Sequence, residues 1–360
     1  LPAYAMQSTG VVPSDVPREA ADRHRLRVAL RACRKPVVTG TFHEGSFEAM
    51  RRMLACVRGG EEELRERPLA IFDCCPSPPL AWSALTTSAL IECAAAGIPA
   101  ELVSMPMTGA TAPVTLLGAI TQHTAENLSG LVIHQLAAPG APLIYGGSPS
   151  AFDMRQGTTP MGAVETMMID AAYAEVGKHL GLPVHAYMGL SDAKLPDYQA
   201  GLESGTGALL AALAGINVVS GPGMLDFESC QSLEKLVVDN EIAGMVLRMV
   251  RGIEPREDFP AVPRFEELLA EGHLLISKHT RTHLRAEQIL PGPAIDRANR
   301  SRWLEEGGST IGQRARREVD RRIAAHEPVP LSGEVVAALE ERMAAEARRV
   351  GMPELPARAR

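Results

Sequence analysis

The sequence predicts a (β/α)8 TIM barrel with a C-terminal helical extension. Short apolar runs alternate with helical periodicity along the chain, which is typical of repeated β-α units around a parallel sheet. Aromatic residues make up only 4% of the 360 residues, a composition that suits aliphatic packing of helices on a sheet. A doubly wound open sheet is the alternative, but the phosphate-binding fingerprint expected near its first strand is missing.

The predicted barrel has eight strands, each a short apolar run. In chain order they are Ala3–Gln7, Pro36–Gly40, Leu69–Asp73, Glu101–Met105, Pro142–Tyr145, Pro183–Met188, Ile216–Ser220 and His273–Ser277. In barrels of this kind the chemistry lies at the carboxyl ends of the strands.

Helical patterns lie between these runs, and several end at a glycine suited to a left-handed cap, such as Gly97 and Gly215. The predicted helices are Pro17–Cys33, Phe47–Val57, Trp82–Ala96, Pro113–Asn127, Met161–Leu180, Tyr198–Ala214 and Ser229–Val250. A tract rich in proline and charge, Glu254 to Pro263, is expected to loop out before the eighth strand.

The chain is predicted to have two parts, a barrel over residues 1–326 and a helical tail over residues 327–360. The tail begins at the break Pro328-Val329-Pro330 and continues as an amphipathic helix, Gly333–Val350. Because this helix could cover the barrel or a neighbouring subunit, we expect a homo-oligomer.

Composition argues against several classes of protein. A net charge of -7 and a pI near 5.9 give no electrostatic footprint for nucleic acid. No apolar run approaches about 18 residues, so no membrane span is expected. The six cysteines lack C-x-x-C spacing, which suits reduced thiols in a cytoplasmic protein. The start, LPAYAM, does not resemble a signal peptide and is interpreted as the cut edge of a longer chain.

Aromatic rings and thioethers gather just after the predicted strands. The rings are Phe42, Tyr145, Phe152, Tyr187 and Phe227, and the methionines are Met107, Met154, Met188 and Met224. A dry cup of this kind suits a methylated ammonium group, because ring faces attract a desolvated cation by roughly 2 kcal/mol or more. The alternative is that these rings cap the core of the barrel.

Three histidines, His43, His185 and His279, lie at or near the same rim, where one could carry a proton or bind a ligand. The alternative is an ordinary hydrogen-bonded role. No H-x-x-H or H-E-x-x-H pair is present, so we predict no metal site.

Two long stretches, residues 146–194 and 201–245, resemble the trimethylamine/glycine-betaine family of corrinoid methyltransferases, as does the ISKHTRTHL run from Ile276. The resemblance implies a (β/α)8 barrel. It also implies methyl transfer from a methylated amine to the Co(I) of a corrinoid (cobalamin) on a separate protein. Trimethylamine members carry pyrrolysine, which we place within Met224 to Glu228. This chain has only standard residues and resembles the branch associated with quaternary amines such as glycine betaine.

From the rim positions and the resemblance together, we expect catalytic roles for Asp226, Phe227, Glu228 and His279. The expected substrate-binding residues are Phe42, His43, Tyr145, Phe152, Asp153, Arg155, Tyr187, Asp192, Gly223 and Arg281. Asp226 or Asp153 would balance the charge of the cation, and Arg155 or Arg281 would pair with a substrate carboxylate. The Gly221-Pro222-Gly223 turn would let the backbone approach the substrate.

The corrinoid itself is expected to come from outside. The chain contains no D-x-H-x-x-G sequence, the usual lower-ligand pattern of corrinoid carriers. We therefore expect a cognate corrinoid protein to dock over the rim, with no corrinoid held tightly by the chain. The alternatives are the same chemistry on carnitine or proline betaine, or a non-catalytic barrel that binds a methylated amine.

Overall fold

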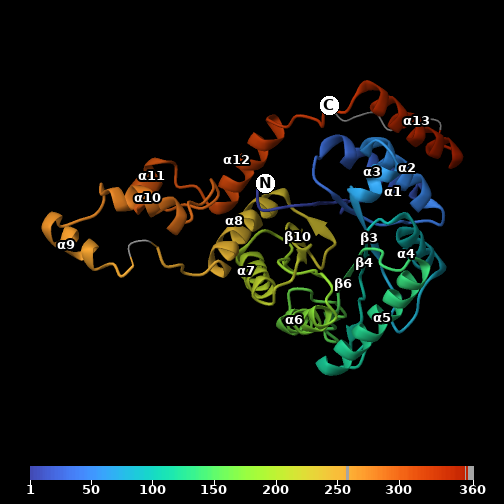
Figure 1. Cartoon of the computed structure of the whole chain (residues 1–360), viewed down its shortest axis with the longest axis horizontal. Helices are drawn as coiled ribbons and strands as arrows, with labels where there is room; N and C mark the ends of the chain where they lie inside the picture. The colour runs from blue at the N-terminus through green and yellow to red at the C-terminus, as the bar shows by residue number, and fades with distance from the viewer. Residues whose placement is uncertain (257–258, 353, 356–360) are drawn as a thin grey trace.

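The computed structural model describes residues 1–256, 259–352 and 354–355, and a curled parallel sheet forms its centre (Figure 1). The strand order is β1-β2-β3-β4-β6-β8-β9, and every neighbouring pair is parallel. The strands are β1 (Gln7–Ser8), β2 (Val37–Thr39), β3 (Ala70–Cys74), β4 (Ala100–Leu102), β6 (Leu143–Gly147), β8 (Val184–Ala186) and β9 (Val218–Val219).

Helices connect successive strands, as parallel pairing requires. They are α1 (Arg18–Ala32), α2 (Ser46–Arg58), α3 (Glu61–Glu66), α4 (Ala84–Ala96), α5 (Leu116–Ala137), α6 (Val164–His179), α7 (Tyr198–Leu213) and α8 (Leu233–Val250). Side chains cap the first turn of several helices. Asp197 accepts from the Ala200 N–H at the start of α7, and Ser232 accepts from the Lys235 N–H at the start of α8. The predicted α/β fold with a parallel sheet is confirmed as a seven-stranded half-barrel.

The predicted eighth strand, His273–Ser277, is wrong. Its apolar side chains Leu275 and Ile276 are exposed, and the segment is a turn that leads into α10 (Lys278–Glu287). The Ser277 hydroxyl caps that helix by accepting from the Thr280 N–H, and the Thr280 hydroxyl donates to the Leu274 carbonyl. This local capping satisfies the backbone without a sheet partner.

The first residues bridge the open side of the half-barrel. The Ala3 N–H donates to Asn240 Oδ1 at 3.1 Å, and the Tyr4 hydroxyl donates to the Leu236 carbonyl at 2.8 Å. Both acceptors lie on α8, so β1 begins at Gln7 rather than at the predicted Ala3.

Two further helices pack on the body. The ion pair between Arg23 and Glu346, 2.9 Å apart, joins α1 to α13 (Gly333–Arg349), whose Leu339 and Met343 are buried in the larger apolar core. α12 (Ile311–Ala324) lies along α8 and buries Val319 with Val237.

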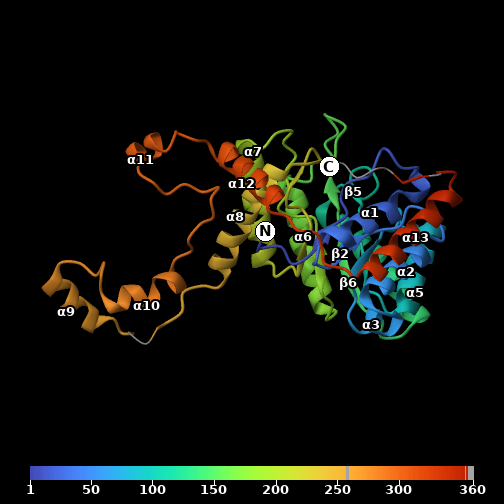
Figure 2. The ribbon, with the colours of Figure 1, turned by 90° about the horizontal axis from the view of Figure 1, so that it is seen from above.

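Residues 253–256 and 259–287, which we call the arm, project away from the body in both views (Figures 1 and 2). The arm carries α9 (Val262–Glu271) and α10. The chain then returns to α8, where Ala294 is buried beside Val237, before α11 (Arg300–Glu305). Within the described residues, no helix combines the length and the apolar character that crossing a bilayer requires.

Candidate functional site

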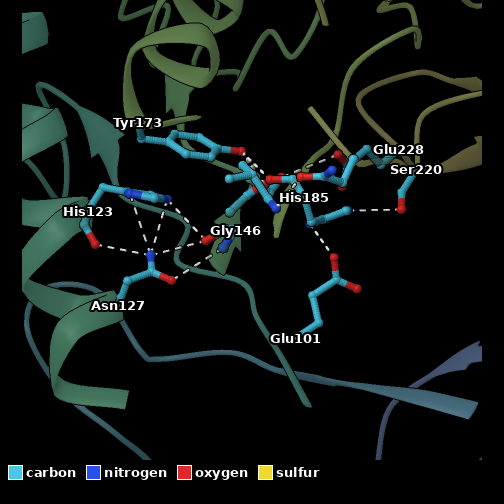
Figure 3. A network of polar contacts seen from close by, with 12 residues as sticks. Glu101, His123, Asn127, Gly146, Tyr173, His185, Ser220 and Glu228 are labelled. Atoms are coloured by element: carbon cyan, nitrogen blue, oxygen red, sulfur yellow. Dashed lines mark hydrogen bonds and ion pairs between the residues drawn. The ribbon is translucent and has the colours of Figure 1, made fainter. Parts of the chain in front are cut away.

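A buried polar cluster lies across the sheet from β3 through β4, β6 and β8 to β9 (Figure 3). Glu101 Oε1 in β4 lies 2.7 Å from His185 Nδ1 in β8, and both side chains are almost fully buried. His185 Nε2 lies 2.9 Å from the hydroxyl of Ser220, which follows β9. The ring of Tyr187 meets the His185 ring edge to face at 4.9 Å. The imidazole is thus held between a carboxylate, a hydroxyl and a ring.

A second carboxyl group adjoins Glu101. Burial, followed by the charge and hydrogen bonding of Glu101, raises the pKa of Asp73 in β3 well above its usual range. Burial and the neighbouring Glu101 carboxyl both disfavour the ionised form of Asp73. Arg25 from α1 lies in the same region, with its guanidinium 4.3 Å from the centre of the Phe42 ring. The cluster therefore favours a protonated Asp73 beneath the rim.

Behind this cluster, a buried scaffold fixes β6. The Tyr173 hydroxyl donates to the His185 carbonyl at 2.8 Å, and its ring stacks on His123 at 4.1 Å. His123 Nε2 lies 3.1 Å from the Gly146 carbonyl, to which the Asn127 amide also donates (Figure 3). Burial lowers the pKa of His123 to about 3, so this histidine is neutral. Its role is therefore to hold the strand.

The hairpin β10 (Met224–Leu225) to β11 (Cys230–Gln231) projects a strained tip over the cluster. Asp226, Phe227 and Glu228 have φ of 49°, 54° and 69°. Left-handed backbone at a non-glycine residue costs of order 1–3 kcal/mol, and such strain tends to occur at functional sites. The tip turns Glu228 inward.

Glu228 is the buried carboxyl at this tip. Its Oε1 accepts a hydrogen bond from the Ser148 hydroxyl at 3.3 Å, which links it to the segment after β6. Burial raises its pKa to about 7. The charges of Asp73 and Glu228 both raise the pKa of Tyr187, after the larger effect of burial, so Tyr187 lies near both carboxyl groups.

Neighbouring segments hold the strained tip in place. The Asp226 N–H donates to the Ala193 carbonyl at 3.0 Å. The Lys194 ammonium lies 3.4 Å from the Asp226 carboxylate and 3.9 Å from the centre of the Phe227 ring. At the base of the hairpin, the Gly223 N–H donates to Asp239 Oδ2 at 2.7 Å. Asp226, Phe227 and Gly223 therefore position Glu228.

Asp192 joins two loops at the same edge of the sheet. Its carboxylate accepts from the N–H groups of Met161 and Gly162 at 2.8 and 2.9 Å, and its own N–H donates to Glu203. Burial raises its pKa to about 6 despite those hydrogen bonds.

The structure brings some of the predicted site residues together and separates others. Glu228, Tyr187 and Phe42 lie around the cluster, and Asp226 and Phe227 precede Glu228 in the hairpin tip, where Lys194 contacts both. His279 and Arg281 lie on α10 in the arm, away from the rim where the sequence predicted them (Figure 1). His43 and Phe152 are half-buried, in the loop after β2 and just after β7 (Ser150–Ala151), which pairs with β5 (Met107–Thr108).

Three other predicted residues have different surroundings from those expected. Asp153 and Arg155 pair with each other at 2.8 Å, and the Arg155 side chain is 86% exposed. Tyr145 is fully buried in the core around Tyr173. Its ring is therefore part of the barrel core, in line with the alternative that rings near the strand ends cap that core.

Asp73, Glu101, Ser148 and Ser220 were not singled out as candidates from the sequence, and His185 was considered only as one of several histidines. The signal was present in Glu101, a charged residue at the start of an apolar run, because buried strands rarely carry an unpaired charge. Over the described ranges, no three His, Cys, Asp or Glu side chains gather as metal ligands.

Comparison with known proteins connects this geometry to one group of enzymes. The model of the family "Trimethylamine methyltransferase (MTTB)" matches residues 2–351. A trimethylamine methyltransferase of Desulfitobacterium hafniense (strain DSM 10664 / DCB-2) is 35% identical over 91% of this chain and 66% of its own length. A glycine betaine methyltransferase of Desulfitobacterium hafniense (strain Y51) is 31% identical over 94% of this chain and 71% of its own length.

The chain therefore spans about two-thirds of the length of these relatives. Among solved structures, the dihydropteroate synthase of Yersinia pestis aligns with 62% of this chain and 77% of its own, at 14% identity and a TM-score of 0.36. That likeness is too distant to support an argument.

Proposed function

The chain belongs to the trimethylamine methyltransferase family, and we propose that it transfers a methyl group from a methylated amine to the cobalt of a corrinoid carried by a separate protein. The relatives support the methyltransferase activity. The corrinoid carrier rests on the resemblance found in the sequence. Self-association of the chain is likewise proposed.

We propose a quaternary amine of the glycine betaine kind as the substrate. The chain has only standard residues, in line with the branch that lacks pyrrolysine, and one of its relatives is a glycine betaine methyltransferase. A quaternary nitrogen leaves as a neutral amine, so the site needs no acid to protonate it. The reduced cobalt supplies the electron pair for the new bond to carbon, while the pair of the broken C–N bond stays on nitrogen.

The observation that carries this proposal is the inward carboxyl of Glu228, held by a strained hairpin beside Tyr187. A buried carboxylate with an aromatic neighbour attracts a desolvated ammonium cation strongly. In this proposal Glu228 is the countercharge of the ammonium group, and the ring of Tyr187 forms one wall of its binding site. Asp73, Glu101 and His185 act behind them as positioning residues. Phe42, His43, Phe152, Asp192 and Gly223 remain proposed contributors at the rim.

A ligand screen followed by turnover tests the proposal. The chain is melted with glycine betaine, carnitine, proline betaine and trimethylamine, and a ligand at about a hundred times its Kd should add roughly 2.7 kcal/mol of apparent stability. The ligand that stabilises is then incubated with a reduced corrinoid protein, and loss of one methyl group is followed by NMR. Stabilisation without any demethylation would identify a binding protein in place of an enzyme.

A further inference from the structure

The arm is the part of the molecule that the proposed function does not use. Neither α9 nor α10 buries a single residue, although each is a helix of ten residues (Figure 2). Isolated helices shorter than about 12–15 residues are marginal in water, and helices in proteins owe most of their stability to packing of one face. Hydrogen bonds from Arg248 and Arg251 tie the end of α10 to α8, but they leave the apolar side chains of the arm uncovered. Those side chains call for a surface that covers them.

The arm exposes an apolar face. On α9, Val262, Phe265 and Leu269 recur at i, i+3 and i+7, so they share one side of the helix, and Leu269 is 86% exposed. Leu275 and Ile276, in the turn before α10, are 77% and 78% exposed. Large apolar side chains exposed together along one face of a helix mark an interaction site.

The charges of the arm identify what covers it. α9 carries one arginine and three glutamates, a net charge of -2, whereas α10 carries one lysine, two arginines and one glutamate, a net charge of +2 with its histidines neutral. A partner of one sign would match only one of these helices. A second copy of the same arm, related by a two-fold axis, offers the opposite charge to both.

We propose that the arm docks on the arm of a second copy of this chain, with α9 of each copy against α10 of the other. The apolar face supplies the area that is removed from water, and the two helices of opposite charge fix the direction. This inference goes beyond the proposed chemistry and stands independently of it. It also moves the expected self-association from the C-terminal helix, which packs on its own chain, to the arm.

Charge reversal tests whether the arm is an interface and whether a second copy of the arm covers it. One variant carries Glu266→Lys and Glu271→Lys on α9, and a second carries Lys278→Glu and Arg285→Glu on α10. Each variant alone brings like charges together at both contacts, so we expect at least a tenfold weaker self-association by sedimentation. An equimolar mixture restores two attractive contacts, and we expect it to associate as the unaltered chain does.

An apolar variant and a matched control complete the experiment. Phe265→Asp with Leu269→Asp should dissociate the assembly, whereas Tyr198→Asp, at a fully exposed site on the body, should leave it intact. Circular dichroism and thermal melting establish that each variant is folded. A monomeric unaltered chain, reversed variants that keep the mass of the unaltered chain, or a mixture of folded variants that stays dissociated would each overturn the proposal.

Discussion

A carboxyl group that is buried away from water keeps its proton to a higher pH. Burial raises the pKa of Glu228 to about 7, so this side chain is partly protonated at neutral pH. A quaternary ammonium group bound beside it favours the carboxylate, so binding must expel the proton at low pH. Substrate binding and the ionisation of Glu228 are therefore linked.

We expect glycine betaine to bind about tenfold more tightly at pH 8 than at pH 6, because the ionised fraction of a group with a pKa of about 7 changes by about that factor. Calorimetric titration across this range measures it. In Glu228→Gln the affinity should fall at pH 8, and the remaining pH dependence should be small. An unchanged profile in the variant would assign the titration to another group, of which Asp192 is the nearest candidate.

The same group links stability to pH. The pKa of Glu228 is raised above its unfolded value, so the folded state holds the extra proton between about pH 4.5 and 7, and stability falls as pH rises through that window. We expect Glu228→Gln to stabilise the substrate-free chain by about 1–3 kcal/mol at pH 8, since an amide carries no buried charge. The gain should vanish near pH 5. Urea unfolding at the two pH values measures both, and equal effects would contradict the assignment.

At this scale the sequence singled out the hairpin tip as a whole and did not distinguish between its side chains. Asp226, Phe227 and Glu228 were all expected to be catalytic, and only the backbone of the tip decides that Glu228 turns inward while Asp226 meets Lys194. No residue pattern reports three successive left-handed conformations at non-glycine positions, because local sterics disfavour each of them.

At the scale of elements, α8 anchors the hairpin that carries Glu228 through a buried ion pair. Lys235 Nζ lies 2.6 Å from Asp239 Oδ2, which also accepts from the Gly223 N–H. Lys235→Met would leave Asp239 buried without its cation, and we expect a loss of about 3–5 kcal/mol in the free energy of unfolding. Arg302→Met, which breaks an exposed pair with Glu306, should change the free energy of unfolding little, because water screens exposed ion pairs. Similar losses in the two variants would contradict the anchoring role.

The C-terminal helix is expected to belong to the body. Met343 is fully buried against α2 in the larger core, so Met343→Ala should cost about 2–5 kcal/mol in chemical unfolding, in the same transition as the barrel. A separate, earlier transition for this helix would show instead that the tail folds on its own.

Helices and strands differed in how far the sequence could predict them. The helix predicted over Tyr198–Ala214 agrees with α7 to one residue, because Asp197 caps its start and an unbroken pattern defines the rest. The helix predicted to end at Asn127 continues to Ala137 as α5. The eighth strand failed because a short apolar run is ambiguous, and the cap at Ser277 was the stronger signal.

At the scale of the whole molecule, we propose that a second protein carrying the corrinoid docks over the strand ends of the seven-stranded half-barrel. We expect equilibrium dialysis to show no stable stoichiometric binding of free cobalamin, because the chain lacks the carrier pattern D-x-H-x-x-G. Tight binding of free cobalamin would remove the need for a docked carrier.

The most direct measurement of the central claim follows glycine betaine with one labelled methyl group in the presence of the chain and a reduced corrinoid protein. We expect dimethylglycine and methylated corrinoid to form in equal amounts, and the rate to fall at least tenfold in Glu228→Ala, because the cation loses its countercharge. Betaine that binds but stays intact, or a variant that turns over as fast as the unaltered chain, would contradict the account.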